Sequence, residues 1–198
     1  MRKFFALILA TLSLLSCEKS GNTTPEVTPE PEVEPTVYKV GDLYDVDGVK
    51  GIVFRVDEKG ESGLIVSLSE PDTPLAWSTE LISTGSTIRQ SGEQNTAIIY
   101  TLPNWEAKYP AFAWCKSLGR DWYIPSINEL KELLIISKGN TFLQGLINNN
   151  ATKFSSDNKY LSSTEMDEFW VYLADYATNK ESANYKQYTY RVRAIHTF

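Results

Sequence analysis

Few residues in this chain have the chemistry of a catalytic or metal centre. The 198 residues include two cysteines, Cys17 and Cys115, and one histidine, His196. A single histidine cannot build a histidine-rich zinc site, and it weakens any Ser-His-Asp or Cys-His interpretation. Cys115 falls on the apolar face of a predicted helix, which is typical of a buried, unreactive thiol. We therefore expect no enzyme activity, no bound metal and no cofactor.

Two short stretches resemble calcium loops without completing one. "DVDG", residues 45–48, begins like a calcium-binding loop, but no glutamate follows at the required spacing. Asp-Gly between β-forming residues is a hairpin signal instead. "LPNW", residues 102–105, lacks the acidic residue that a lectin calcium loop needs, and the chain has no glycine-rich phosphate loop.

The N-terminus has the features of an exported protein. A basic start at residues 1–3 precedes an apolar run at residues 4–15, which is too short to span a bilayer and fits a secretory signal. The run ends in "LLSC", which resembles the lipobox of bacterial lipoproteins. We predict a lipoprotein signal peptide over residues 1–16 and lipidation of Cys17. The alternative is that Cys17 is an ordinary cysteine near a cleavage site.

The segment after Cys17 differs in composition from the rest of the chain. Residues 17–37 are rich in Pro, Glu and Thr and have no apolar period, which predicts a disordered tether. Residues 38–198 are expected to form one domain. The formal charge of −6 becomes −8 without Arg2 and Lys3, and the five Glu and one Lys of residues 18–37 leave −4 for the domain. This acidic balance argues against a nucleic-acid partner.

The order of predicted elements indicates an α+β fold. Residues 38–70 contain apolar runs separated by Asp-Gly and other turn signals, as expected for strands. Helices are predicted over residues 92–100, from Pro110 to about residue 118, and from residue 127 to about Gly139. The segments "KYLSSTE", "FWVYLADYA" and "YKQYTYRVRAIHTF" return to strand character. Strands, then two or three helices, then strands are not the alternation of a parallel sheet.

The stretch "GRDWYIPSINELKELL", residues 119–134, places two large aromatic residues before a marked helix start. Ser126 followed by Glu129 is a capping box, in which the serine accepts from an early amide and the glutamate reaches back. We expect Trp122 to lie in the core. For Tyr123 a core position and a surface position both remain open, and its hydroxyl needs a partner in either case.

The same stretch resembles the D-W-Y-L-P-S-x-x-E-L signature of an uncharacterised bacterial domain family. That family includes the C-terminal domain of the Legionella collagen-like adhesin. The resemblance continues in order through "GIVFRVDEKGESGLIVSL", Asn95-Thr96, "YLSSTE", Trp170 and "RVRAI", so it covers about residues 40–198. The family is similar to the Fibrobacter major paralogous domain. The resemblance implies a C-type-lectin-like fold: small twisted antiparallel sheets flanked by two or three helices, with the first and last strands paired.

Aromatic residues outside the predicted helix faces are the candidates for a ligand-binding surface. Exposed rings can stack on sugars or anchor a protein partner. The alternative is that alternate members of each strand face the core. The candidate binding residues are Trp77, Trp105, Tyr109, Tyr172, Tyr185 and Tyr188.

These expectations describe a lipid-anchored binding module of a bacterial cell envelope, on the outer membrane. The expected function is adhesion, or capture of a glycan or of an envelope or host protein, without catalysis. The alternative is a structural or assembly component of an envelope protein complex. Glycan binding requires a concave aromatic patch with nearby amides or carboxylates, whereas an assembly role requires a broader, flatter apolar surface.

Overall fold

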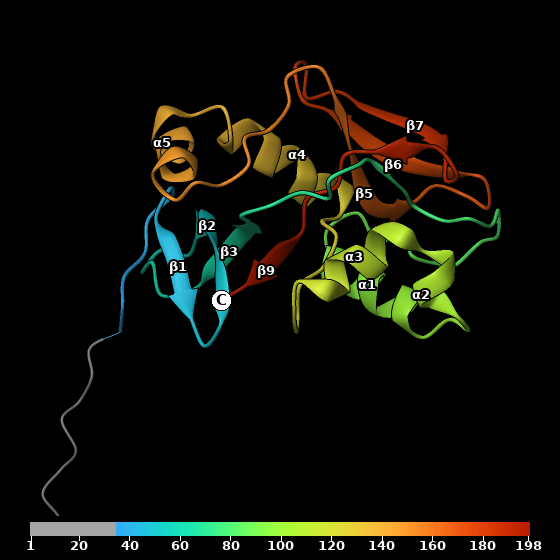
Figure 1. The fold of residues 1–198 in the computed structure, drawn as a ribbon, viewed down its shortest axis with the longest axis horizontal. Coiled ribbons are helices and arrows are strands. Elements are labelled where there is room, and N and C mark those ends of the chain that lie inside the picture. Colours follow the sequence, from blue (N-terminus) through green and yellow to red (C-terminus); the bar gives the residue numbers. More distant parts are fainter. Residues whose placement is uncertain (1–34) are drawn as a thin grey trace, which may run out of the picture. The chain divides into compact units, whose positions relative to one another are not determined.

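The computed structural model describes residues 35–198. The predicted signal peptide, Cys17 and most of the predicted tether lie outside the described residues. No helix within residues 35–198 is long and apolar enough to cross a membrane. The described chain is a mixed α+β structure (Figure 1).

The largest sheet has four antiparallel strands in the order β1-β2-β3-β9. Its strands are β1 (Leu43–Val46), β2 (Val49–Val56), β3 (Gly63–Ser67) and β9 (Ile195–Thr197). The predicted hairpin between β1 and β2 is confirmed, with Val46 paired to Val49. Asp47 and Gly48 at its tip both have positive φ, 51° and 81°, as a two-residue turn of this kind requires.

Two smaller sheets complete the β structure, and both are antiparallel. A three-stranded sheet has the order β5-β6-β7, and a two-stranded sheet joins β4 to β8. Their strands are β4 (Leu75–Ala76), β5 (Lys159–Glu165), β6 (Trp170–Asp175), β7 (Glu181–Tyr185) and β8 (Thr189–Tyr190). The strand character predicted for the C-terminal third is therefore confirmed.

The described residues contain five helices, where two or three were expected. They are α1 (Gly92–Tyr100), α2 (Trp105–Lys108), α3 (Pro110–Ser117), α4 (Ile127–Ile136) and α5 (Asn140–Asn148). α1, α3 and α4 begin where the sequence predicts. The capping box is present, because Ser126 accepts from the Glu129 amide and the Glu129 carboxylate accepts from the Ser126 amide. α2 and α5 were not predicted.

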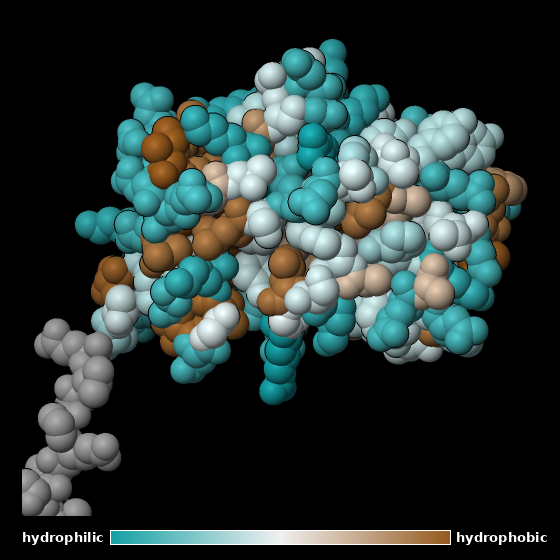
Figure 2. Space-filling view, in the orientation of Figure 1, coloured by the Kyte–Doolittle hydropathy of each residue, from teal (hydrophilic) through white to brown (hydrophobic). Residues whose placement is uncertain are grey.

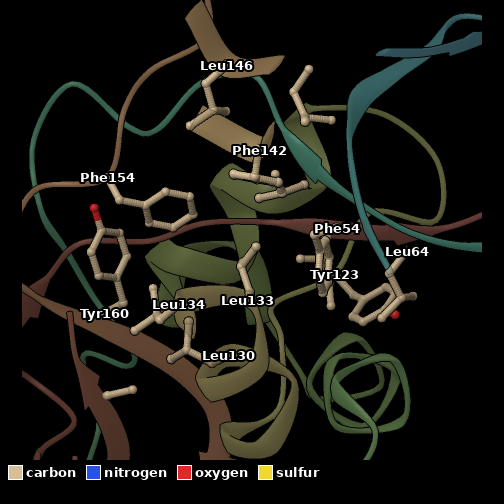
Figure 3. Close-up of a cluster of buried hydrophobic side chains, with 14 of the residues drawn as sticks. Phe54, Leu64, Tyr123, Leu130, Leu133, Leu134, Phe142, Leu146, Phe154 and Tyr160 are labelled. Carbon is tan, nitrogen blue, oxygen red and sulfur yellow. The ribbon is translucent and has the colours of Figure 1, made fainter. Parts of the chain in front are cut away.

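The four-stranded sheet is buried on both faces, and two hydrophobic clusters occupy them. Alternating residues of β2 point to opposite sides: Ile52 and Phe54 belong to one cluster and Val53 to the other. In the first cluster the apolar residues of α4 and α5, including Leu133 and Phe142, pack on Phe54 (Figure 3). In the second, α1 and α3 pack on the opposite side of the sheet. Because both faces are buried, the central residues of β2 form a continuous apolar run and not an alternating pattern.

The expected pairing of the first and last strands is wrong. β1 and β9 form opposite ends of the strand order, because the consecutive strands β1, β2 and β3 form a meander and β9 pairs with the free edge of β3. The two ends of the domain still meet through side chains. The ring of Phe198 lies 5.2 Å from that of Tyr38 and 4.8 Å from that of Tyr44, measured between centroids.

Trp122 and Tyr123 are both buried, and they point into different clusters. Tyr123 bridges to Ile195 of β9, its amide donating to the Ile195 carbonyl (3.0 Å) and its carbonyl accepting from the Ile195 amide (2.9 Å). In this extended segment, neighbouring side chains face opposite ways. Trp122 therefore joins the α1–α3 cluster, as expected, and Tyr123 joins the α4–α5 cluster. The Tyr123 hydroxyl lies 3.2 Å from the Thr197 hydroxyl.

Candidate binding surface

Within residues 35–198, the cysteine and the histidine that the sequence offers for catalysis are Cys115 and His196. Cys115 is buried, and that burial raises the pKa of its thiol well above its ordinary value. Because the thiolate is the nucleophilic form, this cysteine is unreactive. His196 is half-buried, with its ring 5.4 Å from the Trp122 ring. Residues 35–198 contain no group of three or more His, Cys, Asp or Glu side chains that could hold a metal.

Two of the six candidate binding residues are core residues, so the expectation that their rings are exposed is wrong. Trp77 and Tyr109 both have no exposed surface. Their rings meet edge-to-face, 5.6 Å apart, and Trp77 meets Phe112 in the same way at 5.3 Å. Such pairs add stability beyond the buried area. Both residues lie in segments that the sequence marks as loops, but they are buried in the cluster that also contains Phe112 of α3.

Trp105 begins α2 and is half-buried. Its ring lies 4.3 Å from that of Tyr100 on α1, and it borders a hollow that Lys116 of α3 also lines. Part of the ring remains open to a ligand. Its predicted binding role stays a prediction.

Tyr172, a candidate from β6, lies beneath a charged side chain. The guanidinium carbon of Arg89 is 4.7 Å from the centre of the Tyr172 ring, and the same guanidinium donates to both carboxylate oxygens of Glu181, at 2.8 and 3.0 Å. Lys131 also reaches Glu181, at 3.4 Å. Although partial burial raises the pKa of Glu181, the bonds from Arg89 and Lys131 outweigh it and lower that pKa. A ligand would have to displace Arg89 to stack on this face of Tyr172.

Tyr185 and Tyr188 are exposed, and they belong to a larger aromatic group. We call this group the aromatic tip. Trp170 and Tyr185 form a cross-strand pair between β6 and β7, with nearly parallel rings 4.6 Å apart, and Tyr188 continues the group 5.6 Å from Tyr185. The turn before β6 lies against these rings, because the Met166 amide donates to the Trp170 carbonyl (2.9 Å) and the Lys186 amide donates to the Phe169 carbonyl (3.0 Å). The aromatic tip comprises Met166, Phe169, Trp170, Tyr185 and Tyr188.

The sequence indicated only the two tyrosines of the aromatic tip. Met166 and Phe169 are 50% and 42% exposed. Both lie between β5 and β6, where the Asp167 carboxylate accepts from the amides of Phe169 and Trp170, at 2.8 Å each. Asp167 in "MDEFW" is a signal for such a turn, because aspartate accepts from backbone amides two and three residues later.

A buried ion pair lies directly behind the aromatic tip. Lys186, between the exposed Tyr185 and Tyr188, has no exposed surface. Its ammonium lies 2.6 Å from the Glu165 carboxylate, donates to the Ile82 carbonyl at 2.8 Å, and lies 4.8 Å from the centre of the Trp77 ring. The chain therefore turns inward at Lys186 and outward at the tyrosines on either side of it.

The Glu165 carboxylate joins this pair to a third segment. It accepts hydrogen bonds from the Thr84 amide and hydroxyl and from the Gly85 amide, at 2.6–2.9 Å. Burial raises the pKa of Glu165, but the bonds from Lys186 and Thr84 outweigh it and hold that pKa below the ordinary 4.5. For Lys186, whose charged form is the protonated one, burial lowers the pKa, and the bond to Glu165 opposes this change. The carboxylate therefore stays charged in the folded protein.

Hydrophobic residues elsewhere on the surface do not form one continuous area on the face shown in Figure 2, where separate patches alternate with hydrophilic residues. Five hollows within residues 35–198 are each lined by residues other than those of the aromatic tip. The exposed rings of the tip form a local aromatic surface.

Comparison with known proteins gives a likeness of fold. No family model and no curated protein matches the chain. Among solved structures, a fimbrial protein from Bacteroides ovatus matches with a TM-score of 0.59 and 19% sequence identity. The match covers 81% of this chain and 49% of the fimbrial protein, so the chain spans about half the length of the protein it resembles. At this identity the likeness concerns the fold.

Proposed function

We propose that this chain is a non-catalytic adhesion or assembly protein of a bacterial cell envelope, and that the aromatic tip contacts a protein partner. The exposed rings of the tip carry this proposal. The fold shared with a fimbrial protein supports a surface role, and the resemblance of the sequence to an adhesin domain agrees with it. The C-type-lectin-like fold implied by that resemblance remains part of the proposal.

The chemistry of the aromatic tip favours a protein over a glycan as its partner. Tyrosine and tryptophan are enriched at the energetic centres of protein interfaces, because their large rings bury much area with few rotatable bonds. Phe169 and Met166 add purely apolar surface that offers no hydrogen bond to a sugar. A sugar site needs a hollow with polar groups, and the tip lines none of the hollows described above.

The proposed location follows from the lipidation site and the tether that the N-terminal sequence predicts. Cys17, outside the described residues, would carry the lipid, and the Pro- and Glu-rich segment to residue 37 would hold the domain away from the outer membrane. A lipid anchor of several acyl chains holds a protein firmly. In this arrangement the membrane is contacted only through the anchor, and the aromatic tip is free to meet another envelope or host protein.

Site-specific photocrosslinking in living cells tests this function. A benzophenone amino acid replaces Tyr188 in the full chain, and the cell envelope is irradiated and probed for adducts of higher mass. We expect a discrete adduct with a protein. The matched control carries the same group at Ile135 of α4, since both side chains are 56% exposed and Ile135 lies outside the tip.

Two outcomes would contradict the proposal. One is that position 188 yields no more adduct than position 135. The other is that an adduct forms at position 188 but survives replacement of Trp170 and Tyr185 by alanine, which would place the contact outside the aromatic tip.

A further inference from the structure

A hollow between α1, α3 and the turn before α4 lies apart from the aromatic tip. We call it the α1–α3 hollow, and its volume is ≈ 170 Å³. Pockets that enclose drug-sized ligands measure roughly 300–1,000 Å³. This hollow therefore suits a ligand with the size of one ring. The lining residues that matter to its chemistry are Glu93, Tyr100, Lys116, Asp121, Trp122 and Tyr123.

The walls of the hollow carry both signs of charge. Glu93 on α1 and Asp121 in the turn supply carboxylates, and Lys116 on α3 supplies an ammonium. Asp121 pairs with Arg120 at 3.1 Å, but both side chains are largely exposed, 65% and 90%. Such a pair is worth little in water, so the Asp121 carboxylate can bond to a ligand instead. The Lys116 ammonium lies 5.4 Å from the centre of the Tyr100 ring.

The aromatic residues supply an apolar wall, because their hydroxyls bond to the protein itself: that of Tyr100 donates to the Phe112 carbonyl at 3.4 Å, and that of Tyr123 lies 3.2 Å from the Thr197 hydroxyl. Burial raises the pKa of Tyr100, and burial followed by the charges of Glu129 and Glu93 raises that of Tyr123. Both hydroxyls therefore stay protonated. Trp122 is 5% exposed, so only an edge of its ring reaches the hollow, and the rest is fixed in the core.

The walls are held in place by bonds that do not involve a ligand. The Thr96 hydroxyl of α1 accepts from the Ile124 amide at 3.2 Å, which ties α1 to the turn. Tyr123 is fixed to β9 by two backbone hydrogen bonds with Ile195. Asp121 has a positive φ of 62°, a backbone conformation that aspartate tolerates better than most residues. A site formed in advance loses less entropy when it binds.

We propose that the α1–α3 hollow binds one neutral sugar residue, at an end or a branch of a glycan. Two carboxylates disfavour an anionic ligand, and the Lys116 ammonium disfavours a cationic one. A neutral polyhydroxyl ring fits these groups: its hydroxyls donate to Glu93 and Asp121, one of its oxygens accepts from Lys116, and its apolar side contacts Tyr100 and the exposed edge of Trp122. This site is independent of the protein contact proposed for the aromatic tip.

Saturation-transfer NMR and calorimetry on the full chain test the site. The probes are neutral methyl glycosides of hexoses, deoxyhexoses, pentoses and N-acetylhexosamines, with glucuronate, methylamine and free glycine as charged and zwitterionic comparisons. We expect at least one neutral glycoside to bind at millimolar concentration. The change Glu93→Gln with Asp121→Asn should weaken that binding about tenfold or more, because hydrogen bonds to charged groups are the stronger ones.

Matched variants test whether the sugar binds in this hollow and not elsewhere on the chain. Glu58→Gln changes an exposed carboxylate in the β2–β3 turn and should leave sugar affinity unchanged. Tyr185→Ala with Tyr188→Ala removes the exposed tyrosines of the aromatic tip and should also leave it unchanged. Loss of sugar binding in that tip variant would overturn the placement of the site.

Three further results would overturn the proposal. They are binding of none of the neutral glycosides, equal affinity in the Glu93 and Asp121 variant, and preference for glycine, methylamine or glucuronate. None of these results bears on photocrosslinking at the aromatic tip, so the two proposals fail separately.

Discussion

Replacing Lys186 by methionine should destabilise the protein strongly, although the residue lies in a polar-looking stretch, "YKQY". Lys186 and Glu165 are both fully buried, with 2.6 Å between ammonium and carboxylate. Removing one partner leaves an uncompensated buried charge, which typically costs about 3–5 kcal/mol. Thr84 and Gly85 still donate to Glu165, so we expect the lower end of that range, about 3 kcal/mol. The melting temperature should fall by roughly 6–12 °C.

Urea unfolding of Lys186→Met and of a matched surface variant measures this cost. Lys131→Met is the control, because its ammonium pairs with Glu181 at 3.4 Å and its side chain is 34% exposed. We expect that control to change the free energy of unfolding by no more than about 1 kcal/mol. Adding Glu165→Gln to Lys186→Met should recover part of the loss, since a neutral amide still accepts from Thr84 and Gly85 and leaves no buried charge.

Equal destabilisation by Lys186→Met and Lys131→Met would contradict a cost that arises from burial of the ion pair. A further loss of stability when Glu165→Gln is added to the Lys186 variant would also contradict it, because the cost would then not arise from the unpaired carboxylate. The ion pair has a consequence for function as well. Since Lys186 holds the chain between Tyr185 and Tyr188, its loss should reduce crosslinking from position 188 even where the protein remains folded.

Two other perturbations have defined outcomes. The pKa values of Glu165 and Glu181 are lowered from 4.5 in the folded protein, so the stability they contribute is present above 4.5 and is lost as the pH falls through the lowered values. Melting temperatures from about pH 7 to about pH 3 should decline below about pH 4.5, less steeply in Glu165→Gln, and a flat profile would contradict this. Trp122→Ala should cost about 3–5 kcal/mol in urea unfolding, as a lost core aromatic. Trp105→Ala, a half-buried control, should cost clearly less, and equal losses would contradict the assignment of Trp122 to the core.

Local signals predicted much of the secondary structure, because each depends on a few neighbouring residues. Asp47-Gly48 adopts the two positive φ angles that a tight hairpin needs, and Ser126 with Glu129 satisfies the first amides of α4. α1 has the predicted bounds. α5 gave no such signal, since its first residue follows Gly139 without a side-chain cap. It is stabilised by packing Phe142 and Leu146 into the core.

The candidate surface was harder to predict, because exposure depends on contacts between distant segments. Trp77 and Tyr109 lie in segments with loop composition, yet they meet each other and Phe112 in the core. Conversely, Lys186 has the residue type of the surface and is buried, since its partner Glu165 is 21 residues away along the chain. The pairing of Trp170 with Tyr185 across β6 and β7 likewise needs the strand register.

Polar residues of three sequence motifs, Asn95-Thr96, "YLSSTE" and "DWYIPSINEL", connect different elements of the fold. The side-chain oxygen of Asn95 accepts from the backbone amide of Ile88 at 2.9 Å. The side-chain nitrogen of Asn95 donates to the Ile88 carbonyl at 2.6 Å and to the Ser163 hydroxyl at 3.2 Å. The Thr164 hydroxyl accepts from the Ile127 amide at 3.0 Å, and Glu129 accepts from the Gly92 amide at 2.8 Å. Buried polar groups must be paired, so these residues join α1, α4 and β5 into one network.

This network explains the polar residues at these motif positions, because each buried amide, hydroxyl or carboxylate there has a hydrogen-bond partner on the protein. Asn95, Thr164 and Glu129 use their hydrogen-bonding atoms on the protein itself, so few remain for a ligand. The surfaces that can contact a partner are those with exposed rings or charged side chains outside this network. They lie at Tyr185 and Tyr188 of the aromatic tip and around the α1–α3 hollow. Ligand specificity should therefore change with substitutions in these two places, while substitutions in the network should act mainly on stability.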